Sequence, residues 1–313
     1  MSAPLKNRDG ARRDTRRAPG RRSPLGLGKP GLTAAMFLAP LALFYGVYFV
    51  FGFGVLGVAS TQRVGLTFRN SVDVGIQNFV LVASDPAFIR SLVNTIAFGL
   101  FSVLVAVTLG FVLAMLLASG VRARRFFYTV FLLPSLIPMS LFATVFGRML
   151  ETQDGAFNEF LRAIGLSALA QDWLGDPGAA YVAVALLLTY MIGLPIMYYT
   201  TDVVQVNTAI LEAATLDGAG MWQIFRIMLF PLLRTTHITV ILSVILGSFR
   251  AFDIIYFSTG GQPGGRTDIA GTYIYQATLG QDRVGYAAAA SIIVLLIALA
   301  ISFVQILIKR KAS

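Results

Sequence analysis

Long uncharged stretches alternate with short charged segments along the chain. Five such stretches, and a sixth interrupted only by Arg250 and Asp253, are each long enough to cross a bilayer, because a membrane-spanning helix needs about 20 apolar residues. The pattern therefore predicts an all-α, polytopic membrane fold with six transmembrane helices. We place these helices at Thr33–Gly57, Leu92–Ala118, Phe126–Met149, Ala180–Tyr199, Ile238–Phe257 and Tyr286–Ile308.

The composition supports a membrane protein and excludes several kinds of chemistry. Hydrophobic residues make up 56% of the chain and charged residues 13%, whereas soluble domains average about 45–50% and about 25%. Such a chain has too little polar surface to cover itself in water. It contains no cysteine, which excludes disulfides, thiolate nucleophiles and cysteine-bound metals. Because His237 is the single histidine, we expect no metal site, and we identify no catalytic residue.

Basic residues concentrate near the N-terminus. The net charge is +10, and nine of the 25 Lys and Arg residues lie in the first 29 positions. A basic tail beside a span sets its orientation and contacts anionic lipid, so we expect a membrane-lipid contact rather than nucleic-acid binding. We expect residues 1–32 to form a disordered basic cytoplasmic tail and residues 33–313 to form one transmembrane domain. A cleaved twin-arginine signal is the alternative, but the first apolar stretch exceeds the roughly 7–15 residues of a signal core.

The remaining Lys and Arg residues indicate the orientation, because cytoplasmic loops are enriched in them. An even number of spans places both termini on one side of the membrane. That side would also hold Arg122–Arg125, the segment 202–237 and the basic end Lys309–Lys311. We therefore expect a multi-pass membrane protein with both termini in the cytoplasm.

Two outer loops carry local structure. Between Asp154 and Asp176, apolar residues recur at helical spacing, which predicts a short helix lying on the outer face. The string Gly260–Gly265 contains four glycines and one proline, so it predicts a turn-forming loop.

The segment between the fourth and fifth spans is the most informative part of the chain. Ala209–Leu216 is a run of good helix formers, and Gly218 and Gly220 end it with a tight turn. Met221–Leu229 then resumes with apolar residues at helical spacing. The pattern predicts two short helices that present one carboxylate and several small residues to the cytosol. An ordinary amphipathic interfacial helix is the alternative interpretation.

This segment resembles the Glu-Ala-Ala–three residues–Gly signature of ABC importer permeases, in the form found in sugar-type members. The chain has Glu212-Ala213-Ala214, followed by Asp217-Gly218-Ala219. Further similarity to maltose-type permeases extends over roughly residues 33 to 308, including the segments 74–79, 85–95 and 252–261. Two strings depart from the family pattern, Met228-Leu229-Phe230-Pro231 and Gly260-Gly261-Gln262-Pro263. The resemblance implies an ATPase-coupling helix formed by Glu212, Ala213, Ala214, Asp217, Gly218, Ala219, Trp222 and Phe225.

The resemblance also implies a function and a set of partners. It implies the transmembrane permease subunit, in a bacterial-type cell (inner) membrane, of an ATP-binding-cassette importer for a sugar, oligosaccharide or glycerol-phosphate-type solute. The expected partners are a second homologous permease subunit, two ATP-binding subunits and an extracytoplasmic solute-binding protein. The sequence contains no phosphate-binding loop of the Gly-x-x-x-x-Gly-Lys-Ser/Thr type, so we expect no cofactor on this chain and place ATP and Mg on the partner subunits. A stand-alone secondary transporter or channel is the alternative, followed by a membrane-embedded enzyme.

Arg250 and Asp253 lie inside the fifth predicted span, where a charge is costly and normally faces the bundle interior, a partner or water. Three residues apart, they can pair on one helix face, so a structural ion pair or a partner contact is one interpretation. A place along the translocation path is the other. A sugar path needs hydroxyls, carboxylates and aromatic rings, and our candidates for it are Ser248, Phe249, Arg250, Phe252, Asp253 and Tyr190. Tyr198 and Tyr199 are further path candidates, but tyrosines near a span end are more typical of interface anchors. We expect His237, at the start of the fifth span, to be an interfacial residue, with a gating role as the alternative.

Overall fold

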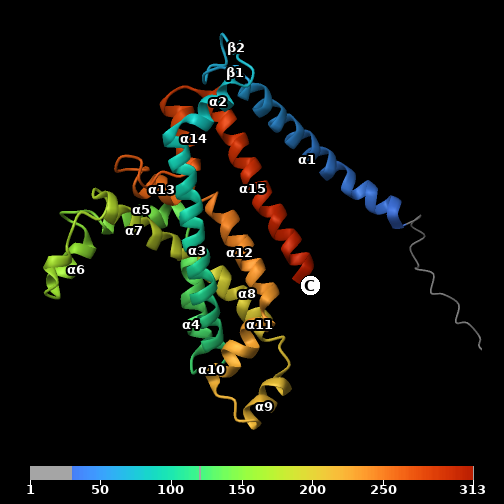
Figure 1. The fold of residues 1–313 in the computed structure, drawn as a ribbon, viewed down its shortest axis with the longest axis vertical. Coiled ribbons are helices and arrows are strands. Elements are labelled where there is room, and N and C mark those ends of the chain that lie inside the picture. The colour runs from blue at the N-terminus through green and yellow to red at the C-terminus, as the bar shows by residue number, and fades with distance from the viewer. Residues whose placement is uncertain (1–29, 120, 313) are drawn as a thin grey trace, which may run out of the picture. The chain divides into compact units, whose positions relative to one another are not determined.

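The computed structural model describes residues 30–119 and 121–312, so the predicted tail up to residue 29 lies outside the described residues. The side chains of residues 30–33, 190, 191 and 309–312 also lie outside them. The described elements are helices apart from one short hairpin (Figure 1). In chain order they are α1 (Pro30–Ser60), β1 (Gln62–Arg63), β2 (Val72–Asp73), α2 (Gln77–Ser84), α3 (Pro86–Ala118), α4 (Arg124–Leu132), η1 (Leu133–Leu136), α5 (Met139–Met149), α6 (Ala156–Ala163), η2 (Ser167–Leu169), α7 (Pro177–Leu188), η3 (Thr189–Ile192), α8 (Gly193–Val203), α9 (Thr208–Leu216), α10 (Met221–Gln223), η4 (Ile224–Leu229), α11 (Phe230–Leu232), α12 (Arg234–Ser248), α13 (Phe252–Ser258), α14 (Ala270–Tyr275), η5 (Gln276–Gly280) and α15 (Val284–Ala312).

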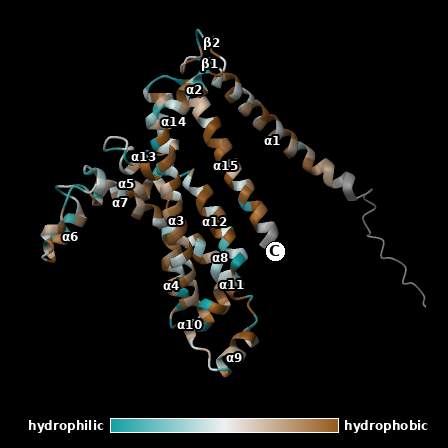
Figure 2. Cartoon of the chain, viewed as in Figure 1, coloured by the Kyte–Doolittle hydropathy of each residue, from teal (hydrophilic) through white to brown (hydrophobic). Residues whose placement is uncertain are grey.

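The chain divides into two compact units, Met1–Gly52 and Phe53–Ser313. In the first unit, α1 carries hydrophobic residues along its length (Figure 2), and large side chains such as Phe37, Leu43 and Phe51 are exposed. A helix that is apolar on all sides is stable only against lipid or another protein. This part of α1 therefore needs a membrane or a partner as its surroundings.

Four helical segments are long and apolar enough to cross a membrane by themselves: Ala34–Ser60, Pro86–Ala118, Pro177–Val203 and Val284–Ile308. Two further pairs of helices are each bent at a short break, and counting each pair as one span gives six spans in total. The predicted six-span helical fold is therefore confirmed, with two spans that are bent.

The third predicted span, Phe126–Met149, is not one straight helix. Its two halves meet at an angle of 94° between Leu136 and Met139. Pro134 lies in the 3₁₀ turn that ends the first half, and Pro138 precedes the second. Since the residue before a proline is pushed out of the helical region, Ile137 is extended with a ψ of 134°, and the chain turns there.

The fifth predicted span, Ile238–Phe257, is divided into two helices. The helix α12 ends at Ser248, and α13 begins only at Phe252. Arg250 is exposed in the break between them. No ion pair joins Arg250 to Asp253 among the described side chains, so the interpretation as a structural ion pair on one helix face is wrong. Before α12, the segment Met221–Leu232 meets it at 68°.

The helix α3 is the centre of the second unit and contributes to three hydrophobic clusters. Phe98 packs with α7 and α13, Phe111 packs with α8, η4 and α12, and Phe88 packs with α14 and α15. Two glycines allow the neighbouring helices to approach. A Cβ on Gly99 would lie 2.6 Å from Ser248 Oγ on α12, and one on Gly110 would lie 3.0 Å from Pro195 Cβ on α8.

The predicted glycine-rich loop is held against the start of α3. The Asn94 side chain donates hydrogen bonds to the carbonyls of Arg266 and Asp268, at 2.9 and 2.8 Å. The Thr95 hydroxyl accepts from the backbone N–H of Ala270 at 2.9 Å. Burial raises the pKa of Asp268 despite the hydrogen bond that it accepts from Thr272. The loop is therefore an ordered part of the fold that fixes the entry to α14.

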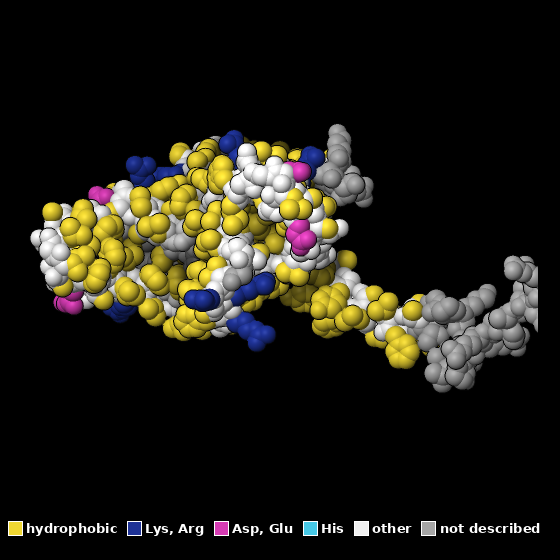
Figure 3. Space-filling model, turned by 90° about the horizontal axis from the view of Figure 1, so that it is seen from below, with side chains coloured by type: hydrophobic (Ala, Val, Ile, Leu, Met, Phe, Trp, Pro, Cys, Tyr) yellow, Lys and Arg dark blue, Asp and Glu magenta, His cyan; other side chains and the backbone are white. Residues whose placement is uncertain are grey.

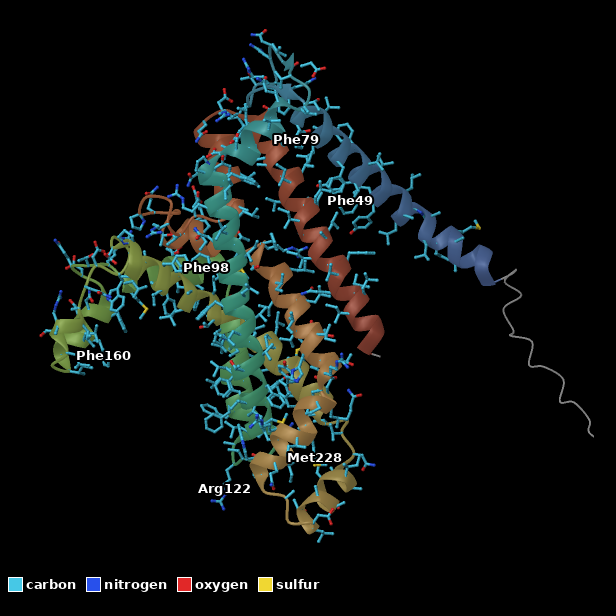
Figure 4. All side chains as sticks on the ribbon, viewed as in Figure 1. Phe49, Phe79, Phe98, Arg122, Phe160 and Met228 are labelled. Atoms are coloured by element: carbon cyan, nitrogen blue, oxygen red, sulfur yellow. The ribbon has the colours of Figure 1, made fainter. Side chains whose placement is uncertain are left out.

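The predicted short helix between Asp154 and Asp176 is present as α6. Its Asn158 is buried, accepts from Trp173 Nε1 at 2.8 Å and donates to the Gln171 carbonyl at 2.9 Å. Phe160 on the opposite side is exposed (Figure 4). The polar side chain thus closes this loop on itself, while the apolar face of α6 remains free for lipid or a partner.

Candidate functional site: the loop between α8 and α12

The helix α9 forms because its two ends are capped by the sequence around it. Asn207 precedes it, and its side chain accepts a hydrogen bond from the backbone N–H of Ala209 at 3.0 Å. Asn is a favoured N-cap because this bond satisfies one of the free N–H groups of the first turn. The helix that was predicted at Ala209–Leu216 is confirmed at Thr208–Leu216.

Gly218 ends α9 in a Schellman motif. Its φ is +85°, in the left-handed region that glycine enters without steric cost. The Gly218 N–H donates to Thr215 O at 3.1 Å, and the Ala219 N–H donates to Ala214 O at 2.9 Å, which is the bonding pattern that defines the motif. The predicted turn at Gly218 is confirmed, and it reverses the chain tightly before α10.

One face of this loop packs inward and the other is exposed. Leu211, Ala214 and Ala219 pack against the cluster around Phe111. The opposite face exposes Glu212 and Ala213. It also exposes large apolar side chains, listed here with their exposed fractions: Leu216 89%, Met221 77% and Trp222 66%.

Seen from this end of the second unit, hydrophobic side chains cover much of the surface, with isolated basic and acidic groups between them (Figure 3). Arg122 and Met228 lie at the same end (Figure 4). Contiguous apolar surface of this kind is typical of a face that contacts a membrane or another protein.

A series of aromatic rings in contact connects the exposed loop to the helix bundle. Trp222 stacks on Phe225 with ring centroids 5.5 Å apart, and Phe225 lies 4.5 Å from Phe111 of α3. Phe111 in turn contacts Tyr199 of α8 at 5.6 Å and His237 of α12 at 5.6 Å. Because packed interiors resist compression, a displacement of Trp222 would be passed to three membrane helices.

His237 joins this series through both ring nitrogens. Its Nε2 lies 2.9 Å from the Phe230 carbonyl and its Nδ1 lies 2.7 Å from the Tyr199 hydroxyl. A carbonyl can only accept, so Nε2 donates and Nδ1 accepts from Tyr199. Tyr199 and His237 are both buried, so the expectation that they anchor a membrane interface is wrong. His237 instead satisfies a carbonyl that the bend before α12 leaves free.

A second hydrogen bond ties the same two helices together. Asp202 at the end of α8 accepts from the Thr236 hydroxyl on α12. The sequence places Asp202 and Thr236 at the two ends of the 202–237 segment, 34 residues apart. The loop between them therefore begins and ends at a fixed separation.

Five of the six predicted path residues lie at the break between α12 and α13, and they differ in exposure. Ser248 is buried at the end of α12, Arg250 is exposed, and Phe249 and Asp253 are half-buried. Phe252 stacks on Tyr256 at 5.1 Å and lies 5.1 Å from Tyr275. The side chain of Tyr190 lies outside the described residues.

The aromatic cluster of Phe252, Tyr256 and Tyr275 includes two residues that the sequence did not single out. The Tyr256 and Tyr275 hydroxyls lie 3.3 Å apart, on helices separated by the glycine-rich loop. Their spacing of 19 residues gives no helical signal, so only the fold brings them together. The cluster combines aromatic faces with hydroxyl groups near Arg250 and Asp253.

A small cavity lies between α3, the η3–α8 segment and α12. Its volume is about 50 Å³, and four hydroxyl-bearing side chains line it: Ser102, Thr189, Ser243 and Ser248. Small-molecule sites usually occupy roughly 300–1,000 Å³. Of the path candidates with described side chains, Ser248 alone lines this cavity, which is too small to hold a sugar.

Comparison with known proteins identifies the family. Residues 106–313 match the family described as "Binding-protein-dependent transport system inner membrane component", a range that includes the whole loop between α8 and α12. YurN of Bacillus subtilis (strain 168), a probable ABC transporter permease protein, is 32% identical over 235 residues, covering 74% of this chain and 80% of YurN.

Two further proteins support the assignment. AmyD of Thermoanaerobacterium thermosulfurigenes, a probable permease for starch degradation products, is 26% identical over 284 residues, covering 90% of this chain and 96% of AmyD. The fold is similar to a chain in a crystal structure of a bacterial ABC transporter that imports the acidic polysaccharide alginate, with a TM-score of 0.76, 22% identity and coverage of 90% of this chain and 97% of that chain. From the match over residues 106–313 and from these relatives, we conclude that this chain belongs to the family of binding-protein-dependent transport system inner membrane components.

Proposed function

We propose that this chain is the permease subunit of an ATP-binding-cassette importer that carries a carbohydrate into the cytoplasm. The observation that carries the proposal is the exposed, Schellman-capped helix α9, whose inner face is joined through Phe225 and Phe111 to three membrane helices. The family match supports the transport role, and the names of relatives such as AmyD support a carbohydrate as cargo.

In this proposal the loop docks into a groove of a partner ATPase. Leu216, Met221 and Trp222 would bury their exposed apolar surface there, and the small residue Ala213 would allow close approach. Burying apolar surface gains roughly 25 cal/mol per Å², so the exposed side chains supply the affinity. Glu212 and Asp217 would set the register with polar groups of the partner.

Coupling then follows from rigid contacts. When the two ATPase subunits close on bound nucleotide, α9 moves with them, and the contacts between the rings of Trp222, Phe225 and Phe111 move α3, α8 and α12 together. The helices change from an inward-open to an outward-open arrangement, and an extracytoplasmic binding protein delivers its sugar to the opened path. Release of hydrolysis products returns the inward-open arrangement.

A second, homologous permease subunit completes the path. The cavity of about 50 Å³ between α3, α8 and α12 supports this, because it is much smaller than the usual small-molecule site. The exposed apolar surface of α1 offers one place for such a partner. The aromatic cluster of Phe252, Tyr256 and Tyr275, with Arg250 and Asp253 nearby, supplies the ring faces and polar groups that sugars bind.

Reconstitution tests the proposal. The chain is purified with the permease and ATPase subunits encoded beside it and inserted into vesicles that contain ATP. Uptake of labelled oligosaccharide is measured with and without the binding protein. We expect uptake that requires the binding protein and internal ATP; uptake driven by an ion gradient in the absence of ATPase subunits would instead establish a secondary transporter.

A further inference from the structure

The β1–β2 hairpin lies at the end of the second unit opposite α9 (Figure 1), and beside it is a polar pocket that the transport proposal does not use. It lies between the β1–β2 hairpin, the start of α2 and the turn before α15, and its volume is about 530 Å³. That volume falls in the range of roughly 300–1,000 Å³ typical of small-molecule sites. Its polar lining includes Arg63, Arg69, Asn70, Gln77, Asp282 and Arg283.

The charge of the pocket favours an anion. Three arginines and one aspartate line it, which leaves a net charge of about +2. The Asp282 carboxylate accepts a hydrogen bond from the Leu66 N–H at 2.6 Å, and no ion pair joins it to the arginines among the described side chains. Side chains Arg63, Arg69 and Arg283 are all exposed. Three arginines therefore line one pocket and, among the described side chains, none of them forms an ion pair with its aspartate.

The Asp282 carboxylate is directed toward the hairpin backbone, where it accepts from the Leu66 N–H. A Cβ on Gly65 would lie 2.6 Å from Asp282 Oδ1, so glycine is needed for the carboxylate to reach the hairpin backbone. Arg283 lies over the Tyr286 ring, with its guanidinium carbon 3.9 Å from the ring centroid. This cation–π contact holds one arginine in place.

The position of the pocket points to lipid. It lies at the ends of two membrane-spanning helices, α1 ending at Ser60 and α15 beginning at Val284. The hairpin beside it exposes apolar side chains, with Leu66, Phe68 and Val72 each more than 40% exposed. Apolar side chains next to free arginines and an aromatic ring are typical of the membrane interface, where head groups meet acyl chains.

We propose that this pocket binds the phosphate head group of an anionic phospholipid. The planar guanidinium matches the geometry of phosphate oxygens and forms paired hydrogen bonds with them. Arg63, Arg69 and Arg283 contact the phosphate, the amides of Asn70 and Gln77 contact the glycerol hydroxyls, and the acyl chains run along the exposed hairpin residues. The lipid ties α1, the hairpin and α15 together at the interface.

Native mass spectrometry of the full-length chain in a neutral detergent tests this proposal. Phosphatidylglycerol and phosphatidylcholine are offered at equal concentration, and the retained lipids are counted. We expect the wild type to retain phosphatidylglycerol preferentially. The double variant Arg63→Gln/Arg69→Gln should bind it more weakly by about fivefold for each arginine removed. Arg283 is left intact because its loss would also remove the contact with Tyr286.

The matched control is Arg162→Gln, which removes an exposed arginine of α6 that does not line the pocket and should retain phosphatidylglycerol as the wild type does. Equal retention by the double variant and the wild type would overturn the proposal. Inorganic phosphate that binds as tightly as the lipid would identify a free anion as the ligand instead. Unchanged lipid retention with weakened capture of the solute-binding protein would identify an acidic protein surface as the occupant.

Discussion

Gly218 has a φ of +85°, and no atom lies within 4 Å of the position that a Cβ would occupy. A substitution there meets open space, so its cost comes from the backbone conformation rather than from a steric overlap. Left-handed backbone is most costly for β-branched residues and least costly for Asn and Asp. The sequence predicts the turn, because glycine commonly ends a helix, but it cannot predict the empty space around it.

This distinction gives a prediction for coupling. Gly218→Val costs about 1–3 kcal/mol of local strain, which should open the Schellman motif and displace Asp217 and Ala219. We expect the complex to assemble and hydrolyse ATP while sugar uptake per ATP falls severalfold. The ratio is measured in vesicles that contain the whole transporter.

The control for this prediction is Gly218→Asn, which occupies the same open space but tolerates left-handed backbone. It should keep most of the coupling. Equal coupling by wild type and Gly218→Val would show that the shape of this turn is not used.

Asp85 caps the start of α3, where it accepts from the Ala87 N–H at 2.8 Å. It also accepts from the hydroxyls of Tyr273 at 2.5 Å and Tyr286 at 2.8 Å. The two tyrosines lie 188 and 201 residues away in the chain, so no local pattern could predict them. Partial burial raises the pKa of Asp85, but the tyrosine and backbone hydrogen bonds outweigh it, and the net pKa is lowered.

A pH dependence of stability follows from this shift. Because the folded protein holds the pKa of Asp85 below its ordinary value, the carboxylate stabilises the fold above that value. The stabilisation begins to be lost as the pH falls below about 5, and the loss is complete once the pH has passed below the lowered pKa of the folded protein. We expect the unfolding temperature of the wild type to fall with acid more steeply than that of Asp85→Asn, measured by thermal unfolding in detergent. If the unfolding temperatures of the two proteins fell equally as the pH is lowered, this role of Asp85 would be contradicted.

At the scale of elements, the sequence predicts where apolar helices lie but not where they bend. Uncharged length and composition identify Phe126–Met149 as a span, and Pro134 and Pro138 are visible in it. The 94° bend depends on which neighbours receive each half, since η1 lies against α8 and α5 lies against α13. The end of α12 at Ser248 is a similar case, because Arg250 leaves the helix rather than pairing with Asp253.

The bent span and α8 meet at a glycine, which gives a prediction for helix packing. A Cβ on Gly193 would lie 2.3 Å from Ser135 Oγ and 3.0 Å from the Phe131 carbonyl. Gly193→Ala should therefore force η1 away from α8 and destabilise the protein by about 1–3 kcal/mol, seen as a lower unfolding temperature.

The matched control is Gly247→Ala on α12, where no atom lies within 4 Å of the added Cβ. Because alanine favours helices more than glycine does, this variant should be as stable as the wild type or slightly more stable. Equal unfolding temperatures for Gly193→Ala and Gly247→Ala would mean that the contact between η1 and α8 is loose.

At the scale of the whole molecule, one chain accounts for the coupling loop but not for a sugar site. The loop is predictable because α9, Gly218 and α10 follow each other in the sequence and are capped by adjacent residues. The translocation path is not predictable in the same way, because Tyr256 and Tyr275 of the aromatic cluster meet only in the folded chain and because, in our proposal, a second subunit adds further residues.

The central claim is that the loop around α9 faces the cytoplasm and docks on a partner ATPase. The chain has no cysteine, so Ala213→Cys introduces a single thiol on the exposed face of α9. A membrane-impermeant maleimide is applied to right-side-out and inverted vesicles. We predict labelling in inverted vesicles alone, and protection from it when the ATPase subunits are bound. Labelling of right-side-out vesicles would contradict the account, because a loop on the outer face could not reach an ATPase.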